Sequence, residues 1–248
     1  VQKTSVRKDA RIIGSRWVLR QKSSICKARL VVTDVAHSKG GPELYAPTPS
    51  LACLRLLLAH ASAMAKRGGG PGRRYVLKTG DVQTAFLNSA CPDEIFIRPP
   101  KDCEEDRSIL WKLKKSLYGL RKAPRLWHEH LKSLMLEAGW RPSLFDGSLY
   151  TYPSGGILVV HVDDVIVSAE ESVVESFFES LKKSIVFGST SDVLYDKGEV
   201  EFLGRNIRRD GSVYYLSGDE RLIDLSLDEL NLRDCKEVAT PGVAYRSE

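Results

Sequence analysis

The chain has 248 residues, a hydrophobic fraction of 42% and a formal net charge of +5. This length suits one large domain or two small ones, and the composition is that of a globular protein that can fill a core. No signal peptide is visible, and no apolar run reaches the roughly 18 residues that a membrane span requires. The positive charge fits a polyanionic partner such as nucleic acid, although many unrelated proteins are as basic.

The cysteines indicate the redox compartment of the protein, and the first residue bears on whether the chain is a fragment. The 5 cysteines are scattered, with no C-x-x-C pair and no small secreted framework. We therefore expect reduced thiols in a cytosolic or nuclear protein. Because the chain begins with Val1 and not with Met, we also expect it to be a piece of something longer.

The first part of the chain predicts strands, one helix and a basic loop. Residues 11–35 look like strands, and a helix should follow Pro49 and end at Gly68. The loop "RGGGPGRR" (67–74) is no Walker A loop, because no G-K-[ST] follows at the required spacing. It is open whether this loop is simply solvated or binds a nucleic-acid backbone. The apolar stripe of the helix consists of Leu51, Leu54, Leu57, Leu58 and Ala61.

A strand, a second helix and a hairpin follow. "RYVLKTGDVQTAFL" (74–87) reads as a strand that runs into a turn around Asp81. The second helix should begin with Pro124 in its first turn and close at Gly139. "SLYTYPSGGILVV" (148–160) is a hairpin with Pro-Ser-Gly-Gly as its turn. The second helix should face the core with Trp127, Leu131, Leu134 and Ala138.

The last part predicts a third helix and another hairpin. Ser168 and Glu171 match a capping box at the start of the helix. Residues 199–217 read as a hairpin that turns on Asp210-Gly211. The interleaved order of strands and helices predicts an α+β fold with helices on one face of a sheet. The third helix should turn inward Val173, Val174, Phe177, Phe178 and Leu181.

Two adjacent acids interrupt the apolar stretch "ILVVHVDDVIVS" (157–168). An unpaired carboxylate in an apolar setting costs several kcal/mol or gives up its charge. We therefore expect two short strands, with residues 161–164 as the tight bend between them, so that Asp163 and Asp164 sit at a hairpin tip. Asp is common in turns, and V-D-D-V on its own would usually be no more than a turn.

A third acid, Asp81, lies at the end of its own predicted strand. Its presence favours a functional role for Asp163 and Asp164 over a simple turn. If the two strands are neighbours in one sheet, three carboxylates can converge at one edge. Such a cluster is unstable unless cations sit among it, and hard oxygen ligands in an open site suit Mg²⁺. Two such ions roughly 4 Å apart are the usual arrangement for phosphoryl transfer between nucleotides.

Other catalytic or metal sites have little support. His128 and His130 are two residues apart on a predicted helix, so they point to different faces and form no zinc pair. The sequence contains no G-x-S-x-G elbow and no Cys/His pair with a local signature.

Several short motifs occur together along the chain and cover nearly all of it. They are "KARLVV" (27–32), "YAPTPS" (45–50), "DVQTAFLN" (81–88), "EIFIRPP" (94–100), "KKSLYGLRKAPRLW" (114–127), "HVDD" (161–164), "EFLG" (201–204) and "DCKEVATPG" (234–242). By these motifs the chain resembles the reverse transcriptase domain of copia-type long-terminal-repeat retrotransposons, in which they occur in the same order. The strongest signal is the succession of "DVQTAFLN", "SLYGLRKAPRLW" and "HVDD".

The resemblance implies a right-hand polymerase with an antiparallel palm sheet backed by helices. We expect a fingers-like region over 1–75, a palm over 76–210, and the start of a thumb or connection over 211–248, with the ribonuclease H domain absent. The implied activity is RNA-directed DNA polymerisation, with dNTPs and a primed RNA or DNA template as partners. No membrane partner is implied. Integrase and ribonuclease H domains are expected in the parent polyprotein, in a cytoplasmic virus-like particle or the nucleus.

The resemblance also assigns the carboxylates. It implies that Asp81, Asp163 and Asp164 are the catalytic acids. Asp81 and Asp163 would hold two Mg²⁺ ions, for which Mn²⁺ can substitute, with the Val82 carbonyl as an extra ligand. Asp164 would lie nearby and be less directly involved.

Five further residues would contact the nucleotide or template. Phe86 would be the steric gate that excludes a ribose 2′-OH, although a plain core aromatic is the alternative. Lys27 and Arg29 would neutralise the triphosphate, and a solvated strand face is the alternative for them. Gly119 would allow close backbone approach in the segment that packs against template and nucleotide, and Pro124 would start the helix that follows.

Three departures from the family pattern bear on function. His161, near the primer end, stands where the family usually has Tyr, and it could equally be a structural substitution. The "GGGPG" loop resembles an insertion, and the chain stops just after "ATPG".

A catalytically silent copy, kept as a nucleic-acid-binding or scaffold domain, is the main alternative function, and the intact acids argue against it. A metal-dependent nuclease would explain the acids but not "SLYGLRKAPRLW" or Phe86.

Overall fold

The fold is known from a computed structural model, and the statements below concern the part of the chain that it describes. Three predicted features lie wholly or partly outside that part: residues 68–73 of the basic loop, Tyr45 of the second motif and residues 236–242 of the last motif. Among the described helices, none is both long and apolar enough to cross a membrane. The structure describes residues 1–22, 25–34, 46–67, 74–103, 106–191, 194–195, 197–218 and 220–235.

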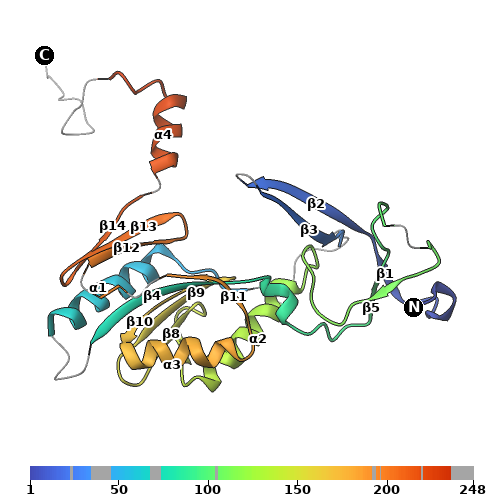
Figure 1. Ribbon diagram of the computed structural model, residues 1–248, viewed down its shortest axis with the longest axis horizontal. Coiled ribbons are helices and arrows are strands. Elements are labelled where there is room, and N and C mark those ends of the chain that lie inside the picture. Colours follow the sequence, from blue (N-terminus) through green and yellow to red (C-terminus); the bar gives the residue numbers. More distant parts are fainter. Residues whose placement is uncertain are drawn as a thin grey trace, which may run out of the picture.

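A six-stranded sheet in the order β11-β4-β10-β9-β8-β7 forms the centre of the molecule (Figure 1). All neighbouring strands in it are antiparallel. The predicted hairpin at 148–160 is confirmed as β8 and β9, and the predicted bend at 161–164 joins β9 to β10. The strands are β4 (Tyr75–Val82), β7 (Arg141–Pro142), β8 (Leu149–Thr151), β9 (Ile157–His161), β10 (Asp164–Glu170) and β11 (Phe187–Thr190).

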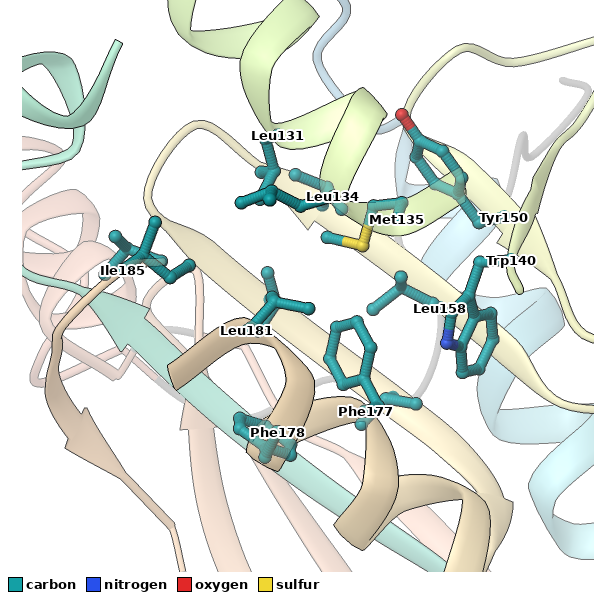
Figure 2. Close-up of a cluster of buried hydrophobic side chains, with 14 of the residues drawn as sticks. Leu131, Leu134, Met135, Trp140, Tyr150, Leu158, Phe177, Phe178, Leu181 and Ile185 are labelled. Atoms are coloured by element: carbon teal, nitrogen blue, oxygen red, sulfur yellow. The ribbon is translucent and has the colours of Figure 1, made fainter. Parts of the chain in front are cut away.

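Both faces of the sheet are covered, so the prediction of helices on one face is wrong. Val165 and Val167 of β10 join the core beneath α2 and α3, whereas Ile166 joins the core beneath α1. Successive strand residues point to opposite faces, and the apolar run on β10 therefore needs cover on both. Figure 2 shows side chains of α2 and α3 meeting over the strands. The helices are α1 (Leu51–Arg67), α2 (Ala123–Glu137) and α3 (Glu171–Lys182).

The predicted helices are present, but the capping box is wrong. Ser168 lies inside β10 and is buried, and the residue that precedes α3 is Glu170, which makes no side-chain capping bond. The strand simply runs on to the first residue of the helix. The second helix has Pro124 in its first turn and is followed by Gly139 with φ +87°, as predicted. Of the residues expected to turn inward from α3, Val173 is only half-buried, whereas the buried ones are Val174, Phe177, Phe178 and Leu181.

A second, three-stranded sheet packs on the α1 side. Asp210-Gly211 makes the predicted turn, and Leu203-Gly204 makes another one upstream, both residues of which have positive φ. The buried Arg209 fastens this sheet to the central one, because its guanidinium donates to the carbonyls of Leu194 (2.7 Å) and Tyr75 (3.3 Å). The elements are β12 (Lys197–Phe202), β13 (Arg205–Asp210) and β14 (Val213–Leu216), followed by α4 (Glu220–Glu229).

The N-terminal region forms a small sheet and a projecting two-stranded ribbon, and its strands agree with those predicted for 11–35. The ribbon, β2 with β3, extends over the central sheet (Figure 1). The small sheet has the order β1-β5-β6, with β1 parallel to β5. These strands are β1 (Arg11–Ile13), β2 (Ser15–Lys22), β3 (Ile25–Val32), β5 (Ile95–Ile97) and β6 (Trp111–Lys112). Short 3₁₀ helices occupy Lys3–Ser5 and Ala85–Asn88.

Gly119 joins the ribbon to the segment that leads into α2. The Val32 N–H donates to the Tyr118 carbonyl (2.8 Å), and Gly119 has φ +85°. A Cβ on Gly119 would lie 2.1 Å from the Val32 carbonyl oxygen. The close backbone approach expected of Gly119 is therefore to β3 of this chain.

Gly119→Ala should lower the free energy of unfolding by roughly 2 kcal/mol or more, because backbone strain and a backbone clash coincide. Gly139→Ala is the matched control. Its φ is also positive, at +87°, but its nearest neighbour would be the movable Tyr152 ring at 3.1 Å. Denaturant unfolding of both variants checks this, and equal destabilisation would contradict the role given to the Val32 contact.

Candidate active site

The register of the central sheet brings two of the predicted acids face to face. Asp164, the first residue of β10, pairs directly with Asp81 of β4. Residues directly opposite on antiparallel strands point to the same face, with Cβ atoms about 4.5–5.5 Å apart. The expectation that the two strands are neighbours and meet at their acids is confirmed.

Asp163 is held beside this pair by its backbone. It follows Val162, which has φ +53°, in the turn between β9 and β10. The Val82 N–H donates to the Asp163 carbonyl (2.7 Å), and the Trp127 indole N–H donates to the Val162 carbonyl (2.6 Å). Trp127 is fully buried in α2, so the turn is fixed by both the neighbouring strand and the helix beneath it.

The acids influence one another electrostatically. Burial raises the pKa of Asp164 to about 6, and the negative charges of Asp163, Asp81 and Glu201 add to this effect. Like charges opposite each other in a sheet are destabilising, so a cation at this edge would relieve the repulsion.

The side chain of Asp81 extends towards β11. A Cβ added to Gly188 would lie 3.2 Å from the Asp81 Oδ2 atom, so a larger residue at 188 would press on this carboxylate. Gly188 is a residue that the sequence analysis missed. It lies at the register shift between β11 and β4, next to Ser189, which is the residue that pairs with Asp81.

Tyr118 links the acids to the ribbon and to Phe86. Its ring lies edge-on to Phe86 with 5.0 Å between centroids, and the Arg29 guanidinium lies 5.6 Å from its centroid. Burial raises the pKa of Tyr118, with further contributions from Asp163 and Asp81, while Arg29 lowers it. The structure therefore gathers Arg29, Phe86 and Tyr118 on the side of the acids. Tyr118 was not singled out, although it lies within "SLYGLRKAPRLW".

The remaining predicted residues occupy different places. Lys27 is exposed on β3, two residues from Arg29 and on the same ribbon face. Val82 is buried at the end of β4, and His161 ends β9 opposite Asp164. Pro124, in the first turn of α2, lines a small cavity together with Trp127 and Val162. None of the contacts described for Pro124 joins it to the acids.

The donor set fits a partly hydrated ion better than a closed protein cage. Within the described ranges, no three His, Cys, Asp or Glu side chains form a group that could hold a metal ion. The three acids therefore do not form one metal-binding group by themselves, and the ligand set implied by the resemblance, Asp81, Asp163 and the Val82 carbonyl, stays a prediction. Mg²⁺ commonly binds through one or two carboxylates and takes its other ligands from water and substrate phosphates. Asp81 and Asp163 fit that pattern, since both add negative charge around Asp164 and Tyr118.

Asp164 should make the protein less stable as pH rises. Its folded-state pKa, about 6, lies above the ordinary value of 3.8, so the folded state holds this proton more tightly than the unfolded state does. Stability should fall between roughly pH 4 and pH 6 and then level off. Without divalent ions, Asp164→Asn should reduce this fall by on the order of 1 kcal/mol or more, since one unit of pKa corresponds to about 1.4 kcal/mol.

Thermal unfolding at a series of pH values measures this, with Asp102→Asn at an exposed position as control. Parallel pH profiles for the wild-type protein and Asp164→Asn would contradict the electrostatic account of the acid pair.

Comparison with known proteins gives a match to one family and to several transposon polyproteins. Residues 2–244 match the family described as "Reverse transcriptase (RNA-dependent DNA polymerase)". The "Retrovirus-related Pol polyprotein from transposon RE2" of Arabidopsis thaliana is 28% identical over 244 residues, covering 93% of this chain and 16% of that protein. The corresponding polyprotein from transposon TNT 1-94 of Nicotiana tabacum is 28% identical over 250 residues, covering 94% of this chain and 18% of that protein.

The chain thus spans less than a fifth of the length of these polyproteins (16% and 18%). Among solved structures, it is similar to the foamy viral protease-reverse transcriptase in complex with double-stranded DNA. That similarity has a TM-score of 0.45 and 14% identity, and it covers 90% of this chain and 33% of the other.

Proposed function

Because the chain belongs to the reverse transcriptase (RNA-dependent DNA polymerase) family, we propose that it is the polymerase domain of a copia-type polyprotein. In this proposal it transfers a deoxynucleotide from a dNTP to a primer 3′-OH on an RNA template. The observation that carries the proposal is the pairing of Asp164 with Asp81, together with the backbone hydrogen bond that holds Asp163 beside them.

Each acid has a part in this reaction. Asp81 and Asp163 would hold the divalent ions, with the Val82 carbonyl as an additional oxygen donor, and Asp164 would add negative charge close by. When bound, Mg²⁺ ions supply the charge that lowers the pKa of the primer hydroxyl and stabilises the leaving pyrophosphate. The protein contributes mainly positioning and electrostatics, as in other phosphoryl transfers. The bonds that fix the 162–163 turn support this role, since small displacements of ligands are costly to catalysis.

The placement of the other residues supports a nucleotide site between the ribbon and the central sheet. Arg29 and Lys27 project from the same face of β3, and Arg29 reaches the Tyr118 ring. We assign the triphosphate to these two cations and the deoxyribose to Phe86. His161, at the end of β9, is assigned to the primer end, and the segment from Gly119 to Pro124 is assigned to the template side.

Arg29→Ala should raise the KM for dNTP about tenfold while changing the Kd for template–primer less than threefold, because the triphosphate loses a charged partner. Steady-state kinetics and fluorescence anisotropy measure the two quantities. Arg16→Ala provides a control in the same ribbon, on the same face and nearer its base. If Kd for the duplex increases while KM stays constant, Arg29 contacts the nucleic-acid backbone and not the nucleotide.

The wider setting follows from the family. We propose that residues 1–75 act as fingers, 76–210 as a palm and 211–248 as the start of a thumb or connection. The parent polyprotein would carry integrase and ribonuclease H domains, and the chain would work in a cytoplasmic virus-like particle or the nucleus. Template and primer would bind largely through phosphates, so their affinity should fall as salt rises.

Extension of a 5′-labelled primer annealed to RNA tests the proposal against the two alternatives. A polymerase lengthens the primer in the presence of dNTPs and Mg²⁺. A silent scaffold binds the duplex and leaves the primer length unchanged, and a nuclease shortens one of the strands. Binding without extension would therefore replace the proposed function by the scaffold alternative.

A further inference from the structure

Trp127 and Trp140 are two fully buried tryptophans of one core cluster that differ in the use of their indole N–H groups. The Trp127 N–H donates to the Val162 carbonyl over 2.6 Å. The Trp140 N–H is buried as well, but it has no hydrogen-bond partner in the part of the chain that the structure describes. Both rings fill the core, and the Trp127 ring in addition holds a backbone carbonyl of the turn that carries Asp163.

The residue that Trp127 holds has an unfavourable backbone conformation. Val162 has φ +53°, in the left-handed region, where a β-branched residue is an outlier. Such a conformation persists only where the surrounding structure determines it, and residues of this kind cluster at functional sites. Because Val162 directly precedes Asp163, its dihedral angles decide where the Asp163 carboxylate points.

Packing alone fixes this turn incompletely on the helix side. Val162 and Trp127 both line a cavity of about 20 Å³, together with Val160, Pro124 and Leu131. A cavity of this size offers about the space of one water molecule. Side chains that border empty space lack dispersion contacts there. The hydrogen bond from Trp127 therefore carries a large share of the restraint on Val162.

A second hydrogen bond restrains the same turn from the opposite side. The Val82 N–H donates to the Asp163 carbonyl over 2.7 Å, and Val82 directly follows Asp81 in β4. Two consecutive carbonyls of the turn are thus held, one by α2 and the other by β4. Release of the Val162 carbonyl should weaken the neighbouring bond and change the spacing between Asp163 and Asp81.

We propose that Trp127 is a positioning residue, which holds the Val162–Asp163 turn through its indole N–H so that Asp163 can share a divalent ion with Asp81. The motif "SLYGLRKAPRLW" ends at Trp127, so its last residue acts on the motif "HVDD" from beneath. The inference deepens the proposed function and rests on it for the metal. The restraint on the turn rests on the hydrogen bonds alone.

Trp127→Phe removes the indole N–H and keeps an aromatic ring. Trp140→Phe is the matched control, because it makes the same chemical change in the same cluster but removes an N–H that has no partner. If Trp127→Phe does not fold, Trp127 is replaced by benzothienylalanine, which has the shape of tryptophan but no N–H.

Two quantities are measured on the full chain. The first is the hydrogen-exchange rate of the Val82 amide, taken by NMR relative to the amides in the centre of β10, so that local opening is separated from global unfolding. The second is the Mg²⁺ concentration that gives half-maximal addition of a single nucleotide to a primed RNA template.

In the Trp127 variant, the relative exchange rate of the Val82 amide should increase about tenfold, since the turn opens more often. The half-maximal Mg²⁺ concentration should also rise about tenfold, the lower end of what loss of a group that orients a metal ligand typically costs. Trp140→Phe should change neither quantity, although it lowers stability.

Equal changes in both variants, or no change in either, would make Trp127 an ordinary core residue and overturn the inference. Faster exchange with an unchanged Mg²⁺ requirement would contradict the positioning role. A raised Mg²⁺ requirement with unchanged exchange would show that Trp127 does not act through the turn. A wild-type chain that adds no nucleotide would refute the polymerase, and the exchange rates would then still decide whether Trp127 holds the turn.

Discussion

Asp163→Asn and Asp81→Asn should each reduce primer extension at least about a hundredfold while leaving the melting temperature unchanged or higher. The loss is expected because each change removes a negative charge that would hold a divalent ion, and electrostatic groups of this kind commonly contribute 10²–10³-fold or more. The stability is expected to survive because the clustered carboxylates repel one another in the absence of metal.

Asp210→Asn is the matched control for these variants, since Asp210 is also an acid at a hairpin turn but far along the chain, where it ends β13 before the turn to β14. It should keep wild-type activity. The assay is extension of a labelled primer with the melting temperature measured in parallel. A folded Asp163→Asn protein with wild-type activity would contradict the assignment of the metal to this edge of the sheet.

Phe86→Val should raise the ratio of ribonucleotide to deoxynucleotide incorporation by roughly tenfold or more, which requires only about 1.4 kcal/mol of relieved discrimination. Phe86 is half-buried, and its ring lies edge-on to the ring of Tyr118. The charges of Asp163 and Asp81 help to raise the pKa of Tyr118, so Phe86 lies on the same side of the sheet edge as these acids. Because protein interiors are closely packed, a ring in this position leaves little room for a 2′-hydroxyl.

The alternative for Phe86 is a plain core aromatic, and it predicts a different result. Phe86 does pack against two apolar clusters, so its truncation should also lower stability somewhat. Phe177→Val is the control, since Phe177 is fully buried against α2 and the sheet. It should lower stability without changing the sugar ratio. The ratio of kcat/KM values for the two sugars decides, and an unchanged ratio in a folded, active Phe86→Val enzyme would remove Phe86 from the site.

The meeting of Asp81 with Asp164 could be predicted from sequence because it depends on local rules. A β-branched run interrupted by two acids predicts two strands and a turn, and a third acid at a strand end predicts a common edge. The turn at 161–164 reverses the chain, so β9 and β10 must be antiparallel, and the observed register confirms this. The same register shows β10 antiparallel to β4, which places Asp164 opposite Asp81.

Other features depend on how distant segments pack, and the sequence did not predict them. Leu77 and Ile166 face α1, while their strand neighbours face α2 and α3. An apolar run does not show which helix will cover each face of the sheet, so the sequence did not predict helices on both faces. The S-x-x-E pattern at Ser168 is satisfied equally well by a buried strand that runs directly into a helix. The contact of Arg29 with Tyr118 requires the position of the whole ribbon, which no local pattern specifies.

Addition of a single nucleotide opposite a defined base of an RNA template tests the central claim most directly. With Mg²⁺ present, the wild-type chain should add only the dNTP complementary to that base, and the added nucleotide should change when the template base is changed. Chelation of the metal should stop the addition, and restored Mg²⁺ should recover it. A folded protein that binds the primed RNA in Mg²⁺ yet adds no nucleotide, or adds one regardless of the template base, would contradict the account.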